Sequence, residues 1–136
     1  MNCIDSHLHL DSWTFPCISE AAAELQQQLT KANLMIQPWS IAEVAQVIAK
    51  HSRLEAFVNV HPDDAEAFSI MNMAINEQGF CGIKLHPRLQ KLDMTSVKLI
   101  ELCRHAASLN VPVLLDAFPD GTGLMQGFDP LHYAKL

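Results

Sequence analysis

The chain opens with a stretch, residues 3–10, that reads CIDSHLHL and guides the interpretation of everything after it. Side chains alternate between the two faces of a β-strand, so His7 and His9 are expected on one face and Leu8 and Leu10 on the other. Neutral imidazole is a common metal ligand, and two imidazoles at one strand end supply half of a zinc-type site. The alternative is a buried strand with two hydrogen-bonded histidines.

Beyond this stretch, short apolar runs alternate with amphipathic segments of helical period. The first strand is expected at about residues 2–6, with the two histidines at its exit. Further strands are expected at 34–36, 56–60, 81–86 and 113–118. Four helices are expected. The first spans 19–32, and the second follows a capping box at Ser40 and Glu43. The third runs from a cap at Asp63 to a stop at Gly79, and the fourth from Asp93 or Thr95 to Leu109, with Asn110 as the stop. This alternation predicts an α/β fold with parallel strand pairing.

Each expected strand is apolar inside and becomes polar where it ends. His7 and His9 follow the first strand, His61 the third, Lys84 and His86 the fourth, and Asp116 the fifth. The carboxyl ends of parallel strands meet at one edge of the sheet, where ligands bind in α/β proteins. These side chains are therefore expected to gather at one rim.

The composition is that of a globular protein. The chain has 136 residues, of which 49% are hydrophobic and 18% charged, and this length fits a single domain, residues 1–136. The formal net charge is −6, and the nine Lys and Arg residues are scattered singly. No basic stripe fits a nucleic acid backbone and no polybasic patch fits a membrane surface, so a small-molecule substrate is the expected partner.

The start of the chain does not resemble a signal peptide, because Asp5 and His7 interrupt any apolar run. No apolar stretch approaches the length of a membrane span. The four cysteines form no Cys-x-x-Cys pair and sit in apolar surroundings, which predicts reduced thiols and a cytoplasmic protein.

Three segments together resemble the amidohydrolase superfamily, in particular the amidohydrolase-related branch of metal-dependent TIM-barrel hydrolases and decarboxylases. They are Asp5-x-His7-x-His9, the block GIKLHP at 82–87, and NVPVLL at 110–115. The resemblance implies a (β/α)8 barrel of TIM type, of which this chain supplies about five of the eight strands. It also implies a divalent metal, usually zinc, at the rim, bound by His7 and His9, with a metal-activated water that attacks a carbonyl.

The chain departs from the family pattern in two places. Asp116 stands where the family usually has a histidine after strand five, and a carboxylate can replace it as the third zinc ligand. The family's histidine on strand six and aspartate on strand eight have no counterpart before Leu136. The chain is therefore expected to be the N-terminal part of a longer enzyme, or a homo-oligomer. A catalytically inactive homologue that serves as an oligomerising α/β module is the alternative function.

The remaining rim residues allow more than one role. Lys84 and His86 are the expected catalytic residues, with Lys84 as a metal-bridging modified lysine or a clamp for a substrate carboxylate, and His86 as acid or base. Trp13 and His61 are expected to line the substrate pocket, although aromatic packing and turn capping explain them equally well. The glycine-rich segment 121–127 is one residue off a dinucleotide fingerprint and is interpreted as a rim loop.

Overall fold

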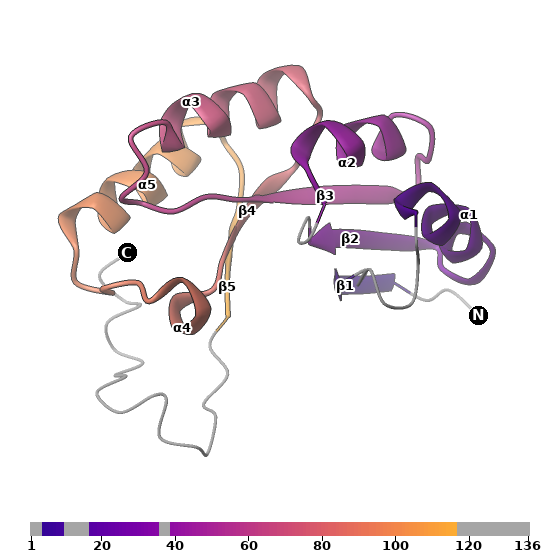
Figure 1. Cartoon of the computed structure of the whole chain (residues 1–136), viewed down its shortest axis with the longest axis horizontal. Coiled ribbons are helices and arrows are strands. Elements are labelled where there is room, and N and C mark those ends of the chain that lie inside the picture. Colours follow the sequence, from indigo (N-terminus) through magenta and orange to yellow (C-terminus); the bar gives the residue numbers. More distant parts are fainter. Residues whose placement is uncertain (1–3, 10–16, 36–38, 117–136) are drawn as a thin grey trace, which may run out of the picture.

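The computed structural model describes residues 4–9, 17–35 and 39–116. Within these ranges, helices and strands alternate along the chain as the sequence predicts (Figure 1). In chain order the elements are β1 (Ile4–His9), α1 (Ile18–Gln28), β2 (Lys31–Met35), α2 (Ile41–Ile48), β3 (Leu54–Asn59), α3 (Ala67–Asn72), the π-helical turn η1 (Met73–Glu77), β4 (Gly82–Leu85), α4 (Pro87–Gln90), α5 (Val97–Ser108) and β5 (Val113–Leu115).

The five strands form one parallel sheet in the order β1-β2-β3-β4-β5. Each strand therefore pairs with the strand before it in sequence. Each helical connection returns the chain to the end of the sheet at which the strands begin. The predicted parallel α/β fold is confirmed. Within the described residues the sheet is open, with β1 and β5 at its two edges. The expectation that these strands are about five of the eight in a TIM-type barrel stays a prediction.

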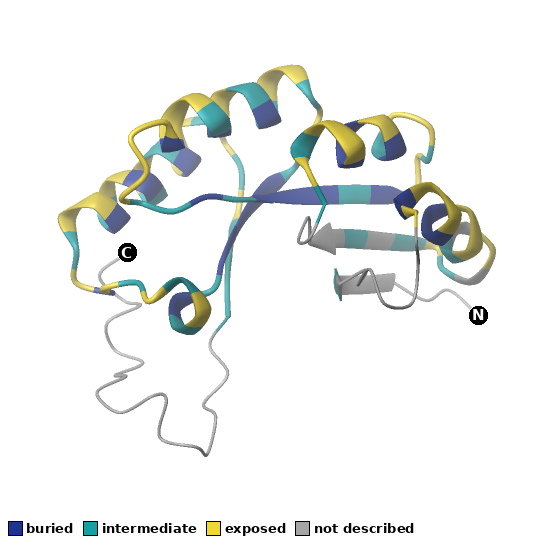
Figure 2. Ribbon diagram, viewed as in Figure 1, coloured by how far each residue is buried: buried dark blue, intermediate teal, exposed yellow. Residues whose placement is uncertain are grey.

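The two faces of the sheet differ in what covers them. Val58 of β3 is level with Ile83 of β4, and both belong to the hydrophobic core formed with residues of the helices, among them Leu99 and Leu102 of α5. The next row of the same strands, Asn59 level with Lys84, faces the other way because side chains alternate. The main helices lie on one side of the sheet, and the buried positions of α2, α3 and α5 turn toward it (Figure 2).

One close approach on the second face requires a glycine. A Cβ atom on Gly82 would lie 2.6 Å from Cδ1 of Phe57, in the neighbouring strand, and would also collide with Cε1 of the same ring. Phe57 is itself buried, so the ring covers the site where a side chain of residue 82 would stand. Gly82 is therefore part of the packing of this face.

Several predicted boundaries are wrong. The first strand is Ile4–His9 rather than 2–6, so the two histidines lie inside the strand and not after it. The first helix ends at Gln28 rather than residue 32, which frees Lys31–Met35 for a full second strand. Leu29 and Ala32 continue the helical spacing of the apolar residues beyond Gln28, and this continuity made the helix look longer than it is.

The predicted helix stops are confirmed, whereas two predicted caps are wrong. Asn110 has a φ of 57° and ends α5 in a Schellman motif, in which the amide N–H of Val111 donates to the carbonyl of Ala106 over 3.1 Å. Asp63 does not cap α3, which begins at Ala67 after Glu66. Asp93 instead accepts hydrogen bonds from Thr95, and α5 begins at Val97 after Ser96.

A β-bulge interrupts β1 at the histidine motif. Asp5 is level with Ala32 and Leu8 with Leu34, so three steps along β1 match two steps along β2. The extra residue lies between Asp5 and Leu8, a segment that contains His7. Bulges are rare between parallel strands and often occur beside functional sites, where they change the direction of a side chain. The regular alternation expected for residues 3–10 therefore does not hold throughout the strand.

The described helices are all too short or too polar to cross a membrane.

Candidate functional site

Lys84 is the one charged residue that the described part of the chain buries almost completely, with 3% of its surface exposed. It lies near the carboxyl end of β4, level with Asn59 of β3 on one side and Leu114 of β5 on the other. This row belongs to the sheet face opposite the helices. Apolar residues of β4 on the helix side, Ile83 and Leu85, fix the strand, and the alternation then turns Lys84 toward the second face.

The amine of Lys84 has no hydrogen-bond partner among the groups that the structure describes. Burial lowers the pKa of this amine, because charge is disfavoured away from water, and the negative charge of Asp116 acts in the opposite direction. A buried ammonium without a partner is costly, since desolvation is not compensated by an ion pair. Such a group is typical of functional sites rather than of a stable core.

His86 follows β4 and begins the short helix α4. Its Nδ1 atom accepts a hydrogen bond from the backbone N–H of Leu89 over 3.4 Å, and its Nε2 atom lies 2.5 Å from Oδ2 of Asp116. Because Nδ1 is an acceptor, the proton of the neutral ring belongs on Nε2, from which it is donated to Asp116. Burial lowers the pKa of His86, and Asp116 partly offsets this effect.

Asp116 extends the β4–β5 ladder by one residue, since its backbone N–H donates to the carbonyl of Leu85 over 3.1 Å. This backbone bond places its carboxylate beside the His86 ring, and the two side chains are only 18% and 16% exposed. The structure therefore brings together three of the predicted rim residues, Lys84, His86 and Asp116, at neighbouring strand ends.

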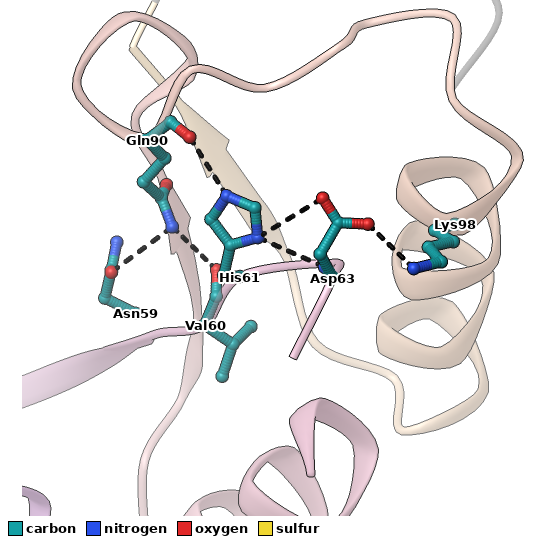
Figure 3. Close-up of polar contacts among 6 residues, drawn as sticks. All are labelled: Asn59, Val60, His61, Asp63, Gln90 and Lys98. Carbon is teal, nitrogen blue, oxygen red and sulfur yellow. Dashed lines mark hydrogen bonds and ion pairs between the residues drawn. The ribbon is translucent and has the colours of Figure 1, made fainter. Parts of the chain in front are cut away.

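Gln90 is a central residue that sequence analysis missed (Figure 3). Its side-chain oxygen accepts from the backbone N–H of His86 over 2.6 Å, and its side-chain nitrogen donates to the carbonyl of Val60 over 2.8 Å. A longer contact of 3.4 Å joins the same nitrogen to Oδ1 of Asn59, whose own amide donates to the carbonyl of Lys84. One glutamine therefore ties the end of β3 to the turn that carries His86. No sequence motif distinguishes it from an exposed helical glutamine.

The ring of His61 is engaged by backbone groups on both sides. Nδ1 accepts from the N–H of Asp63 over 3.1 Å, and Nε2 lies 2.9 Å from the carbonyl of Gln90, to which it donates. Asp63 in turn pairs with Lys98 of α5 at 2.8 Å (Figure 3). These contacts are the turn-capping role considered above, and the prediction that His61 lines a substrate pocket stays a prediction. A cavity of about 260 Å³ lies next to this turn, lined mainly by the β3–α3 connection together with Lys98 and Glu101.

The predicted metal ligands are described to different degrees. His7 and His9 are placed by their backbone in β1, and Trp13 lies outside the described residues. Within the described part of the chain, no three His, Cys, Asp or Glu side chains come together as a metal-binding group. β1 and β5 are four strand-to-strand steps apart, about 19 Å along a flat sheet at about 4.8 Å a step. A shared site for His7, His9 and Asp116 therefore requires a curved sheet.

Comparison with known proteins supports the fold. No protein-family model and no curated protein matches the sequence. Among solved structures, the chain is similar to the crystal structure of a protein from Staphylococcus aureus described as a "putative amidohydrolase", with a TM-score of 0.66 and 18% sequence identity. The match covers 94% of this chain and 51% of the other, so this chain spans about half the length of its structural neighbour.

Proposed function

We propose that this chain forms the first five β/α units of an amidohydrolase-type barrel whose activity is metal-dependent hydrolysis of a small polar or carboxylated substrate. The observation that carries the proposal is the convergence of Lys84, His86 and Asp116 at the carboxyl ends of adjacent parallel strands. Ligands bind at this edge in parallel α/β proteins. The similarity to the Staphylococcus aureus protein supports the same architecture, since barrel closure would supply the curvature that the sheet needs.

The residues present fit a zinc ion by their chemistry. Two imidazoles, from His7 and His9, and the carboxylate of Asp116 form a ligand set of the kind found in catalytic zinc sites. Asp116 already accepts a hydrogen bond from His86, and carboxylates that bind metals are usually held by such a hydrogen bond. When bound, the metal would lower the pKa of its water and polarise a substrate carbonyl.

The other residues of the site have separate roles in this proposal. His86 keeps its proton on Nε2 and holds the Asp116 carboxylate in one orientation. Gln90 fixes the turn from which His86 extends. Lys84 provides a positive charge in a place from which water is largely excluded, where it interacts strongly with a substrate group. His86, which contacts Asp116, is also the group proposed to exchange a proton with a substrate.

The proposed metal site is tested by measuring zinc content by elemental analysis after purification. The unsubstituted protein is expected to bind about one zinc ion per chain. The variant His7→Ala/His9→Ala is expected to bind almost none. His51→Ala/His105→Ala is the matched control, because it removes two histidines that lie away from the carboxyl ends of the strands. Circular dichroism checks that each variant is folded.

Undiminished zinc in His7→Ala/His9→Ala would rule out the proposed site. The second measurement is hydrolysis of a panel of small amides and lactones before and after chelation. A folded protein that binds no zinc, hydrolyses nothing and forms a discrete oligomer by light scattering would favour the non-catalytic module instead.

A further inference from the structure

We propose that the substrate carries a carboxylate and that this carboxylate pairs with the amine of Lys84. The inference narrows the proposed function to one class of substrate. That the ligand is a substrate rests on the proposed function. The binding site itself is argued from Lys84 and its surroundings.

The first step concerns the cost of the buried charge. Lys84 is 3% exposed, and within the described residues its Nζ atom contacts no hydrogen-bond acceptor. Two other described lysines pair with carboxylates nearer the surface, Lys31 with Glu55 and Lys98 with Asp63. The free-energy cost of this buried amine is offset when a bound ligand supplies the missing hydrogen-bond acceptor.

The second step concerns the neighbouring groups that could have supplied the acceptor. Asp116 is the carboxylate whose charge acts on Lys84, but its Oδ2 atom is held by Nε2 of His86. The side-chain oxygen of Asn59 faces Gln90, and the Asn59 amide donates to the backbone of Lys84. The bonds that hold Asn59 and Asp116 in place therefore do not engage the Lys84 amine, which stays available to a ligand in this proposal.

The third step selects a carboxylate among anions. A phosphate group carries close to two negative charges and is usually bound by several donors, such as a helix N-terminus or a bidentate arginine. Here one amine stands near a carboxylate, Asp116, which repels a second negative charge. A carboxylate carries a single negative charge, so it pairs with one ammonium group and meets less repulsion from Asp116 than a phosphate does.

The experiment uses acetate as the probe, acetamide as its neutral counterpart, and sodium chloride at equal ionic strength. Backbone amide shifts are followed by NMR in the zinc-loaded and the chelator-treated protein. Acetate is expected to shift the amides of residues 84–86 and 116 in a saturable way. Lys84→Met is expected to raise the Kd for acetate by about tenfold or more, because a charge-assisted hydrogen bond is lost. Acetamide is expected to bind the wild-type protein correspondingly more weakly.

Lys98→Met is the matched control, since Lys98 is an exposed lysine paired with Asp63. It should leave the Kd for acetate unchanged within about twofold. Lys84→Gln provides a second neutral variant if Lys84→Met is poorly folded. An equal Kd for acetate in the Lys84 variants, or equal binding of acetamide by the wild type, would overturn the inference.

The two proposals fail in distinguishable ways. Acetate binding that depends on Lys84 and survives chelation supports the carboxylate site even if His7→Ala/His9→Ala shows that no metal is bound. Acetate binding that disappears on chelation and ignores Lys84 places the carboxylate on the metal, which overturns the inference and leaves the proposed function standing.

Discussion

Nε2 of His86 lies 2.5 Å from Oδ2 of Asp116, so the residues that follow β4 and β5 are joined directly at the rim of the sheet. The backbone fixes both partners. Asp116 donates its N–H to Leu85, and the His86 ring accepts from Leu89. The pair is therefore a consequence of how the two strands end, and its geometry determines which ring nitrogen carries the proton.

The first prediction concerns this tautomer. In metal-free protein near pH 7, the ¹⁵N shifts of His86 are expected to show a neutral ring with the proton on Nε2, because burial lowers its pKa and Nδ1 is an acceptor. Asp116→Leu should weaken this preference, because Nε2 loses its acceptor while Nδ1 keeps the bond from Leu89, whereas His61, held in the same tautomer by Asp63 and Gln90, should not change. A proton found on Nδ1 of His86 would contradict the prediction.

The second prediction concerns the stability cost of Lys84. Without ligand, Lys84→Met is expected to raise the free energy of unfolding at pH 7 by about 1–3 kcal/mol, because it removes a buried amine that has no hydrogen-bond partner in the described part of the chain. The folded-state pKa of Lys84 is lowered, so the unfolded state holds more protons between that pKa and 10.5, and wild-type stability rises with pH across this window. The advantage of Lys84→Met should shrink there. Urea denaturation between pH 7 and pH 10.5 measures both effects, and an advantage that grows with pH would refute the explanation.

The third prediction concerns Gly82. Gly82→Ala is expected to cost about 1–3 kcal/mol, because its Cβ would overlap the buried ring of Phe57. Phe57→Leu removes the ring atoms that collide, so in that background the cost of Gly82→Ala should fall by more than half. A double-mutant cycle by urea denaturation measures the coupling. Additive effects of the two substitutions would show that the contact is unimportant.

The fourth prediction concerns Gln90. Gln90→Ala leaves the N–H of His86 and the carbonyl of Val60 without their partner, and an expected loss of about 1–3 kcal/mol follows. Hydrogen exchange of the His86 amide should accelerate as well. Gln46→Ala, at an exposed position of α2, is the matched control and should change stability by less than about 0.5 kcal/mol. Equal effects of the two substitutions would argue against a central role for Gln90.

The fifth prediction concerns thiol reactivity. Backbone hydrogen bonds from Glu20 and Ser19 lower the pKa of the exposed thiol of Cys17, whereas burial raises that of Cys81 to about 11. Iodoacetamide at pH 8 should therefore modify Cys17 much faster than Cys81, since the thiolate is the nucleophile. Peptide mass spectrometry gives both rates, and urea should bring them together. Comparable rates in the folded protein would contradict the assignment.

Local sequence signals predicted the framework of the fold and failed at its details. The apolar runs placed all five strands, and the capping box at Ser40 and the stops at Gly79 and Asn110 were located correctly, because each depends on residues close in sequence. The end of α1 and the caps of α3 and α5 were misplaced. There, several polar residues could have served, and tertiary packing selected among them.

The candidate site shows the same division. Strand-end residues such as Lys84, His86 and Asp116 could be listed from the pattern, because parallel strands present their carboxyl ends at one edge. The role of Gln90 could not be predicted, since its contacts join segments about thirty residues apart. The bulge in β1 was also unpredictable, because it is a property of the pairing with β2 and not of β1 alone.

The sequence by itself determined the alternation of strands and helices, the parallel order of the sheet and the polar character of its carboxyl edge, because these follow from local periodicity and from chain connectivity. Only the tertiary structure decided that the His86 proton points to Asp116 and that the amine of Lys84 is buried among groups already bonded to one another. Those outcomes depend on distances between strands that are separated in sequence, and hydrophobic packing against the helices sets these distances.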